Sequence, residues 1–533
     1  MAQHTVLEST LEVFRRHGVT KIFGNPGSNE IPFLAGLTED FDFILGLHEQ
    51  VVVGMAEGYS RATGKPALVN LHAASGSGNA MGALTNARYG HVPLVILAGQ
   101  QVRRTVGQEV MLGSADASIL PAPLVKYSHE PLAAEDVPRT LSQAFFEAET
   151  QPRGPVYVSV PLDDWALPAL DDDKLLAGRS VRAGATPDPE SLAEVTSALN
   201  SSRAPAIVLG PQVDAAAVDD PEIFGAAVRL AEKTDASVFV APSPSRAPFP
   251  TRHPNYKGVL VPSIRSVRDR LAKHDLVLVV GAGLFRYHRW EPSNYLTAGT
   301  TVFHLTQDPR EASRAPFGTS LLTEVGAALT TLAETAEDQG KRRPREREKP
   351  QRTPEGETDE TMTGTQLLEV LNTHLNETVA YVNETTTLDL DYLERIVIDR
   401  PGMYHFPASG GLGFGIPAAV GMSLGAPDKT IVATVGDGSL HYGVSALYTA
   451  AQRRTRTVFV IVNNSGYGAL KGFSRRMGAV NMPGLDVKGI DVVAIAEGYG
   501  VPAQRVSTLD DFDHAYREAL ESEGPVLIDA HVS

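Results

Sequence analysis

The side chains best suited to chemistry follow two hydrophobic runs in the last third of the chain. Gly-Asp-Gly-Ser occupies 436–439 after one run, and Asn-Asn occupies 463–464 after the other. Both runs have the length of buried strands, and the carboxyl ends of neighbouring parallel strands meet at one edge of a sheet. We therefore expect Asp437 and Asn464 to lie together, where a carboxylate and an amide oxygen suit Mg²⁺ and a phosphate group.

Small residues beside this pair would let backbone N–H groups approach a diphosphate. They are Gly438, Ser439, Ser465, Gly466 and Gly468. A Gly-Asp-Gly sequence alone is more typical of an ordinary turn. The prediction of a site therefore depends on both halves being present after strands.

Glu49 is a carboxylate at the predicted junction of a strand and a helix. A strand-like run precedes it, and the apolar residues 51–53 follow it. A carboxyl group in such surroundings can be buried and can share its proton strongly. It could instead complement the dipole at the start of the helix, and the residues alone leave both interpretations open.

Three further side chains could bind a carboxylate or move a proton. Ser28 stands in a turn after a short strand, His72 ends a predicted strand, and His288 follows Tyr287. The ordinary pKa of histidine, about 6.5, allows proton transfer in both directions near neutrality. Each of these residues alone is more typical of a turn or a satisfied surface position.

Parallel sheets are needed to position these residues. Strand-like and helix-like stretches alternate along the first part of the chain, which is typical of parallel sheets with crossover helices. Ser-Gly-Ser-Gly at 75–78 predicts a turn before a helix that ends at about residue 88. Expected strands are 21–24, 43–47, 67–72, 93–98 and 156–160, and expected helices are 5–17 and 49–62.

The chain is long enough for three such units. It has 533 residues, and domains of roughly 100–200 residues are usual. We expect an α/β fold of three parallel-sheet domains over 1–180, 188–335 and 363–533, with a polar linker over 336–362. The basic run in the linker is more typical of a solvated segment than of an anion site. Expected strands of the later domains are 206–209, 237–240, 276–280, 379–382, 431–435 and 458–462.

Composition excludes several classes of function. The formal net charge is −16, whereas a nucleic-acid binder shows a basic face. The absence of cysteine excludes disulfides, thiolate nucleophiles and cysteine-ligated metals. The longest apolar runs are about five residues, far below the roughly 20 that span a membrane, and the start lacks a signal-peptide pattern. We expect a cytoplasmic protein without nucleic-acid or membrane partners.

The paired motif resembles that of the thiamine diphosphate (ThDP) enzymes. The resemblance implies three α/β domains, named pyrimidine-binding, middle and pyrophosphate-binding. It implies ThDP held through Mg²⁺ (or Ca²⁺), with Asp437, Asn464 and the carbonyl of Gly466 as metal ligands. Glu49 matches the glutamate that activates the cofactor of the other subunit, so a homo-oligomer is implied, with a dimer as the minimum and a tetramer expected.

The same resemblance assigns the remaining cofactor contacts. Leu412, between glycines, matches the bulky apolar residue that supports the bent cofactor. Backbone groups at Gly410 and Leu412 match those that bind the aminopyrimidine. The implied cofactor-binding residues are Glu49, Thr386, Thr387, Gly410, Leu412, Asp437, Gly438, Ser439, Asn464, Gly466, Tyr467 and Gly468.

The contexts of Ser28, His72 and His288 are similar to those in the benzoylformate decarboxylase group of this family. The resemblance implies a carbon–carbon lyase that decarboxylates an aromatic 2-oxo acid such as benzoylformate without oxidation. Ser28 would bind the substrate, and the two histidines would move protons at its oxygen and carbon. The implied ring pocket comprises Met111, Leu112, Phe406, Ala469, Leu470 and Phe473.

Alternatives and departures from the pattern stay open. Pro407, Lys471 and Met111 differ from the residues we expect, which leaves the preferred ring substituents undefined. The chain could be a related carboligase or lyase, of the acetolactate synthase or benzaldehyde lyase type, or a non-catalytic scaffold of the same fold. No flavin is expected, because neither 209–211 nor 281–283 has the Gly-x-Gly-x-x-Gly pattern.

Overall fold

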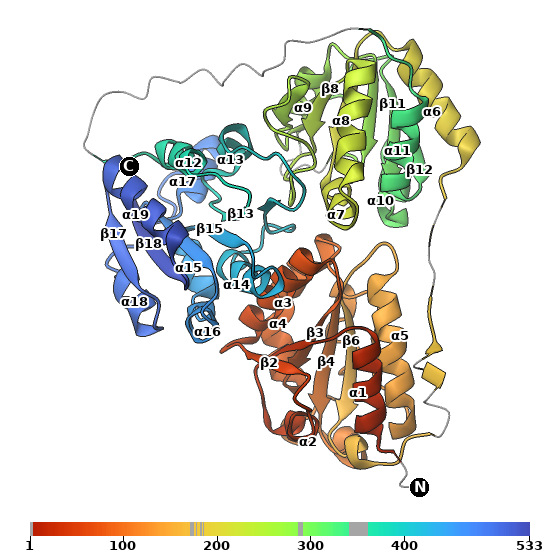
Figure 1. The fold of residues 1–533 in the computed structure, drawn as a ribbon, viewed down its shortest axis with the longest axis vertical. Helices are drawn as coiled ribbons and strands as arrows, with labels where there is room; N and C mark the ends of the chain where they lie inside the picture. The colour runs from red at the N-terminus through yellow and green to blue at the C-terminus, as the bar shows by residue number, and fades with distance from the viewer. Residues whose placement is uncertain are drawn as a thin grey trace. The chain divides into compact units, whose positions relative to one another are not determined.

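The computed structural model describes residues 4–170, 175–176, 178–181, 184, 186–285, 291–340 and 361–533. Its contacts divide the chain into two compact units. The first unit comprises Met1–Ala183, Pro407–Val506 and Glu518–Ala530, and the second comprises Gly184–Phe406, Ser507–Arg517 and His531–Ser533. Figure 1 shows strands flanked by helices in the red, green and blue parts of the chain.

The first sheet has six parallel strands in the order β2-β1-β3-β4-β6-β5. Every residue of β3, β4 and β6 is buried, as expected for parallel strands covered on both faces. The strands are β1 Lys21–Gly24, β2 Asp42–Leu45, β3 Ala67–Leu71, β4 Leu94–Gln100, β5 Ser128–His129 and β6 Val156–Pro161. The helices are α1 Val6–Arg16, α2 Ile31–Ala35, α3 Glu49–Thr63, α4 Ala73–Tyr89 and α5 Val137–Glu149, with short 3-10 turns that include η1 Ser28–Glu30 and η2 Arg103–Gln108.

Local capping explains where α3 begins and ends. The side chain of His48 accepts a hydrogen bond from the backbone N–H of Gln50, 3.2 Å away, so the helix starts at Glu49. Gly64 ends it with φ +69°, a left-handed conformation that glycine adopts without strain. The predicted helix over 49–62 is therefore confirmed.

The predicted turn at 75–78 is wrong. These residues lie inside α4, which begins directly after β3 and packs beside α3. Their small side chains allow close packing: a Cβ added at Gly76 would lie 3.3 Å from Oε1 of Glu49. Glycine and serine act here in helix packing, whereas the local pattern indicated a turn.

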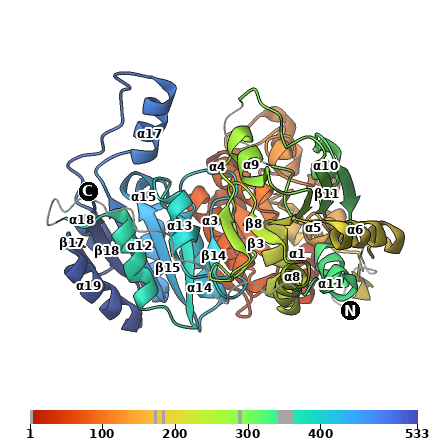
Figure 2. The ribbon, with the colours of Figure 1, turned by 90° about the horizontal axis from the view of Figure 1, so that it is seen from above.

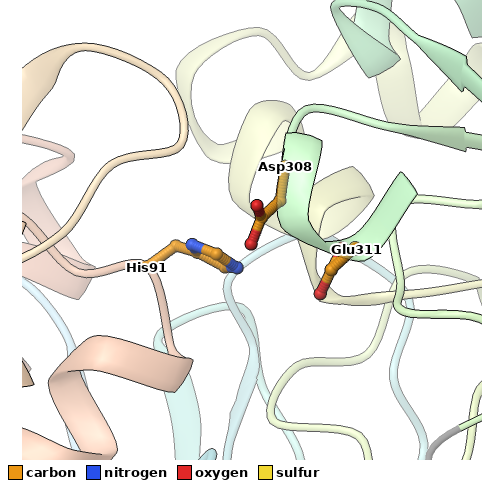
Figure 3. A group of neighbouring side chains, drawn as sticks. All are labelled: His91, Asp308 and Glu311. Atoms are coloured by element: carbon orange, nitrogen blue, oxygen red, sulfur yellow. The ribbon is translucent and has the colours of Figure 1, made fainter. Parts of the chain in front are cut away.

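The second sheet has six parallel strands in the order β12-β11-β10-β7-β8-β9. Asp308 caps α10 by accepting a hydrogen bond of 2.7 Å from the backbone N–H of Arg310, and Glu311 lies in the first turn (Figure 3). The strands are β7 Pro205–Leu209, β8 Ser237–Val240, β9 Tyr256–Val259, β10 Leu276–Val280, β11 Thr301–Thr306 and β12 Thr319–Leu322. The helices are α6 Pro189–Ser201, α7 Pro211–Asp219, α8 Glu222–Thr234, α9 Ile264–Leu271, α10 Pro309–Arg314 and α11 Val325–Thr335.

The third sheet has six strands in the order β14-β13-β15-β16-β18-β17. The strands are β13 Val379–Glu384, β14 Tyr404–His405, β15 Thr430–Gly436, β16 Thr457–Asn463, β17 Ala503–Val506 and β18 Val526–His531. The helices are α12 Gly364–Thr373, α13 Asp389–Arg395, α14 Gly415–Gly425, α15 Asp437–Gly443, α16 Ala446–Arg453, α17 Gly468–Met477, α18 Val492–Gly498 and α19 Leu509–Glu521. The α/β fold with three parallel sheets is confirmed.

Within the first unit, α3 and α14 pack with their backbones in near contact (Figure 1). A Cβ at Gly58 would lie 2.0 Å from the carbonyl oxygen of Ala418, and one at Gly421 would lie 1.8 Å from that of Met55. Larger residues at either glycine would force these helices apart. This packing sets the start of α3 beside the loop that precedes α14.

Among the described residues, the structure contains no helix with the length and apolar composition needed to cross a membrane.

Candidate active site

One edge of the first sheet gathers three of the predicted site residues. Strands β1 and β3 are paired, with Gly24 opposite Asn70, so the segments that follow them leave the sheet side by side. Ser28 lies on η1 after β1, His72 directly follows β3, and Glu49 begins α3. Glu49 is 7% exposed, so the expected burial of its carboxyl group is observed.

The Glu49 carboxyl group is held by two amides that sequence reasoning missed. Asn25 Nδ2 donates to Oε1 over 3.1 Å, and Asn79 Nδ2 donates to Oε2 over 2.9 Å. The amides come from the loop after β1 and from α4. Because each carboxyl oxygen accepts one of these bonds, the group has a fixed orientation and keeps acceptor capacity on both oxygens. Both asparagines were visible in the sequence only as turn or helix residues.

His72 has a buried carboxylate partner, Glu30. Its Nδ1 lies 2.9 Å from Oε2 of Glu30, and the backbone N–H of Gly27 donates to the same oxygen over 2.9 Å. Burial raises the pKa of Glu30 above its ordinary value, although the contact with His72 acts in the opposite direction. A Cβ at Gly27 would lie 2.1 Å from His72 Nδ1, so only glycine lets the loop pack against the ring.

The other predicted substrate residues are placed less completely. Ser28 is exposed, and His288 lies outside the described residues. Met111 is 84% exposed, although its carbonyl oxygen accepts a hydrogen bond from Gln101, and the Leu112 carbonyl accepts one from Asn29. The remaining predicted ring-pocket residues are Ala469, Leu470 and Phe473 on α17 and the buried Phe406 in the second unit.

The two halves of the paired motif meet as predicted. Strands β15 and β16 are parallel neighbours with Gly436 opposite Val462, so Asp437 and Asn464 leave the same edge. Burial raises the pKa of Asp437 above its ordinary value, although hydrogen bonds from the backbone N–H groups of Gly438 and Gly466 act in the opposite direction. These N–H groups therefore face the carboxylate, which brings the second half of the motif against the first.

The donor set fits a divalent cation. Asn464 Oδ1 is buried and has no hydrogen-bond partner among the described residues, which costs free energy unless another group binds it. Asp437 is buried at the start of α15. Two hard oxygens of this kind, with a backbone carbonyl from the following turn, match the preference of Mg²⁺ or Ca²⁺.

Close packing shapes the turn after β16. A Cβ at Gly466 would lie 2.5 Å from the carbonyl oxygen of Leu485, and one at Gly438 would lie 2.6 Å from the ring of Tyr467. A larger residue at Gly466 would therefore collide with the backbone, and one at Gly438 would displace the Tyr467 ring. Ser439 is buried in α15, and Gly468 begins α17.

The loop before α14 is fixed by α3 and α4. Gln50 Nε2 donates to the carbonyl of Leu412 over 3.0 Å, and Asn86 Nδ2 donates to that of Gly411 over 2.9 Å. Gly410 has φ +76°, which favours glycine. Gln50 and Asn86 carry no local signal of this role. In the second unit, Thr386 and Thr387 are exposed after β13.

Comparisons with known proteins agree with this organisation. Three family models match the chain, and all are described as "Thiamine pyrophosphate enzyme". Residues 4–119 match the "N-terminal TPP binding domain", residues 192–332 match the "central domain", and residues 391–530 match the "C-terminal TPP binding domain". Over 529 residues the chain is 48% identical to benzoylformate decarboxylase of Pseudomonas aeruginosa, covering 98% of both chains.

Solved structures show the same similarity. The Rhodococcus jostii RHA1 thiamine diphosphate-dependent 4-hydroxybenzoylformate decarboxylase superposes with a TM-score of 0.96 at 47% identity and 99% coverage of each chain. Benzoylformate decarboxylase from Polynucleobacter necessarius gives a TM-score of 0.92 at 35% identity, again over 99% of each chain.

Proposed function

The chain belongs to the thiamine pyrophosphate enzyme family, and on this basis we propose that it decarboxylates an aromatic 2-oxo acid. Benzoylformate is the proposed example, with the aldehyde and CO₂ as products. The observation that carries the proposal is the 48% identity to a benzoylformate decarboxylase across nearly the whole chain. It makes the chain a carbon–carbon lyase of the carboxy-lyase type. The proposed substrate is a small molecule, and the proposed location is the cytoplasm.

Thiamine diphosphate, when bound, supplies an electron sink for the carbon–carbon bond that breaks. Asp437, Asn464 and the carbonyl of Gly466 would hold Mg²⁺ (or Ca²⁺) against its diphosphate. The unpartnered amide oxygen of Asn464 supports this assignment. The other proposed diphosphate contacts are Thr386, Thr387, Gly438, Ser439, Tyr467 and Gly468.

Glu49 would hold a proton against the aminopyrimidine ring, which Gly410 and Leu412 would also bind through their backbones. Its fixed orientation between Asn25 and Asn79 supports this role, because proton sharing depends on the direction of the carboxyl oxygen. Its burial excludes much of the water that would compete for the same proton.

His72 would move a proton at the substrate oxygen through Nε2. When Glu30 is ionised it accepts the hydrogen from Nδ1, which fixes the tautomer and leaves Nε2 directed away from Glu30. Ser28, exposed on the neighbouring loop, would bind the substrate carboxylate. By resemblance, His288 would transfer the proton at the substrate carbon.

A homodimer is the proposed minimum assembly, with a tetramer built from it. No side chain of α17 is buried, and Figure 2 shows this helix projecting away from β15 and β18. Leu470 on α17 and Val480 after it are exposed apolar residues, and Val480 is 83% exposed. Such a surface favours cover by a second copy. The proposed ring pocket comprises Met111, Leu112, Phe406, Ala469, Leu470 and Phe473.

The middle domain supports the proposal that the chain uses no flavin. At the junction of β7 and β10, the backbone N–H of Gln212 donates to the carbonyl of Gly281 over 3.0 Å. A Cβ at Gly210 would lie 2.3 Å from that of Ala282. These two loops therefore pack closely at the point where the strand order of the second sheet reverses.

Product analysis tests the function. The pure protein with ThDP and Mg²⁺ should release CO₂ and benzaldehyde from benzoylformate, and little acetaldehyde from pyruvate. 4-Hydroxybenzoylformate in parallel would report the tolerance for a ring substituent. Formation of acetolactate from pyruvate, without any benzaldehyde from benzoylformate, would contradict the proposal and favour the carboligase alternative.

A further inference from the structure

A chain of hydrogen bonds runs from the edge of the third sheet to the turn after β16. Asn463 Nδ2 donates to Asp529 Oδ1 over 2.9 Å, and Arg505 Nε donates to Asp529 Oδ2 over 3.0 Å. Arg505 Nη2 also donates to Asp491 over 2.9 Å. The side chain of Asp529 is fully buried on β18, the last strand of the chain.

Sheet register explains how the buried carboxylate receives a counter-charge. Strand β17 is the outermost strand next to β18, and Arg505 stands opposite Asp529 in the pair. The hydrogen bond to Asp529 is the main cause that raises the pKa of Arg505. A buried carboxylate needs such a partner, because an unpaired charge in the interior is strongly destabilising.

Asp529 determines which way the Asn463 amide points. A carboxylate accepts and does not donate, so only the NH₂ group of Asn463 can face it. The Asn463 Oδ1 atom then accepts a hydrogen bond of 3.1 Å from the backbone N–H of Ser465. Ser465 has φ +54°, a conformation that non-glycine residues adopt only with support from their surroundings.

The turn held in this way carries the metal-site groups. Asn464 presents its unpartnered, buried Oδ1 atom, and the N–H of Gly466 faces the Asp437 carboxylate. A rotated Asn463 amide would place an N–H group against the N–H of Ser465 and release the turn. This bond pattern acts on the turn together with the backbone hydrogen bond of 2.9 Å from the Val487 N–H to the Ser465 carbonyl.

We propose that Asp529 is a positioning residue for the divalent cation that carries the diphosphate. It acts through Asn463 on the turn that holds Asn464 and Gly466. This inference rests on the proposed function, because it uses the same metal site. Groups that orient metal ligands typically change metal affinity about 10-fold to 100-fold when they are replaced.

The test is Mg²⁺ binding, read by calorimetry in the presence of saturating ThDP and without substrate. Asp529→Asn keeps the shape of the side chain but offers an NH₂ group, and it should weaken Mg²⁺ binding about 10-fold to 100-fold. Asp491→Asn is the matched control, since it removes an exposed carboxylate from the same Arg505; it should bind Mg²⁺ like the unchanged protein.

Thermal unfolding of the metal-free proteins separates positioning from general stability. If folded Asp529→Asn binds Mg²⁺ with the affinity of the unchanged protein, the inference about Asp529 is wrong but the proposed function stands. If the unchanged protein itself shows no ThDP-dependent Mg²⁺ binding, the proposed function is wrong as well. If Asp529→Asn does not fold, Asn463→Ala replaces it in the test, because it removes the amide through which Asp529 acts. That variant should weaken Mg²⁺ binding, and an unchanged affinity would count against the inference.

Discussion

His72 Nδ1 and Glu30 Oε2 lie 2.9 Å apart at the edge of the first sheet, and the Glu30 side chain is 1% exposed. The two residues are 42 positions apart in the chain. The backbone N–H of Gly27 donates to the same Glu30 oxygen, which holds the carboxylate in place. A fixed carboxyl oxygen beside one ring nitrogen defines which nitrogen of His72 is available to a substrate.

Replacing Glu30 with glutamine should lower kcat about 10²-fold or more while changing KM little. Glutamine can present an N–H group to Nδ1 and so favour the wrong tautomer of His72. Steady-state kinetics with benzoylformate measure the effect. Glu39→Gln, at an exposed position, is the control and should behave as the unchanged protein. A normal kcat in Glu30→Gln would show that the pair is not used in turnover.

Glu49→Gln should lower turnover about 10²-fold to 10⁴-fold, because the amide cannot share a proton with the cofactor ring. Binding of ThDP and Mg²⁺ should persist, since other residues are proposed to hold the diphosphate. A cofactor-dependent rise in melting temperature measures that binding. Asn79→Ala removes one of the two amides on Glu49 and should give a smaller loss. Near-normal turnover in Glu49→Gln would refute the proposed role.

Arg61→Leu should reduce the free energy of unfolding by about 3–5 kcal/mol. Arg61 and Glu57 form a buried pair on α3, with Nη2 2.8 Å from Oε1, and the guanidinium lies 4.9 Å from the Phe414 ring centre. Loss of the arginine removes an ion pair from a fully buried carboxylate. Denaturant unfolding gives the value.

The control for the buried pair is an ion pair at the surface. Arg15 contacts Asp40 over 2.8 Å with both side chains partly exposed, so Arg15→Leu should cost about 1 kcal/mol or less. Equal losses at the two sites would show that burial of the Arg61–Glu57 pair contributes nothing extra.

Stability should fall as the pH drops from 7 to 5, in part because of His17. Its ring stacks on Phe145 at 4.4 Å, and burial, aided by Arg16 and Arg179, lowers its pKa to about 4. The unfolded chain has the ordinary value of about 6.5 and so binds more protons in this range. The stability that the neutral His17 ring contributes is therefore complete above the ordinary pKa of histidine, and it is lost as the pH falls towards about 4.

His17→Gln cannot take up this proton, so its unfolding free energy should decline less between pH 7 and pH 5. Denaturant titrations of both proteins at the two pH values measure the difference. Glu149, whose carboxylate lies 3.8 Å from His17 Nδ1, is the acidic group that could offset the effect. Identical declines in the two proteins would contradict the role of His17.

Local sequence was sufficient for the α/β class and for the paired motif. Buried strands have recognisable hydrophobic runs, and chain order sends the residues after parallel strands to one edge, so Asp437 and Asn464 were predicted to meet. Glu49 was also found at the start of its helix. Its interpretation as an activating carboxylate came from family resemblance, because the residues alone allowed a simple helix charge.

Tertiary structure alone revealed the partners of these residues. Asn25 lies 24 positions from Glu49, and Asp529 lies 66 positions from Asn463. No local pattern links such pairs, because they meet only when strands and helices from different parts of the chain pack. The same cause explains why the turn predicted at 75–78 is wrong. Small residues indicate a turn when only their neighbours in sequence are considered, but in α4 they allow the helix to approach Glu49. Periodicity is a property of neighbouring residues, whereas hydrogen-bond partners depend on how the elements pack.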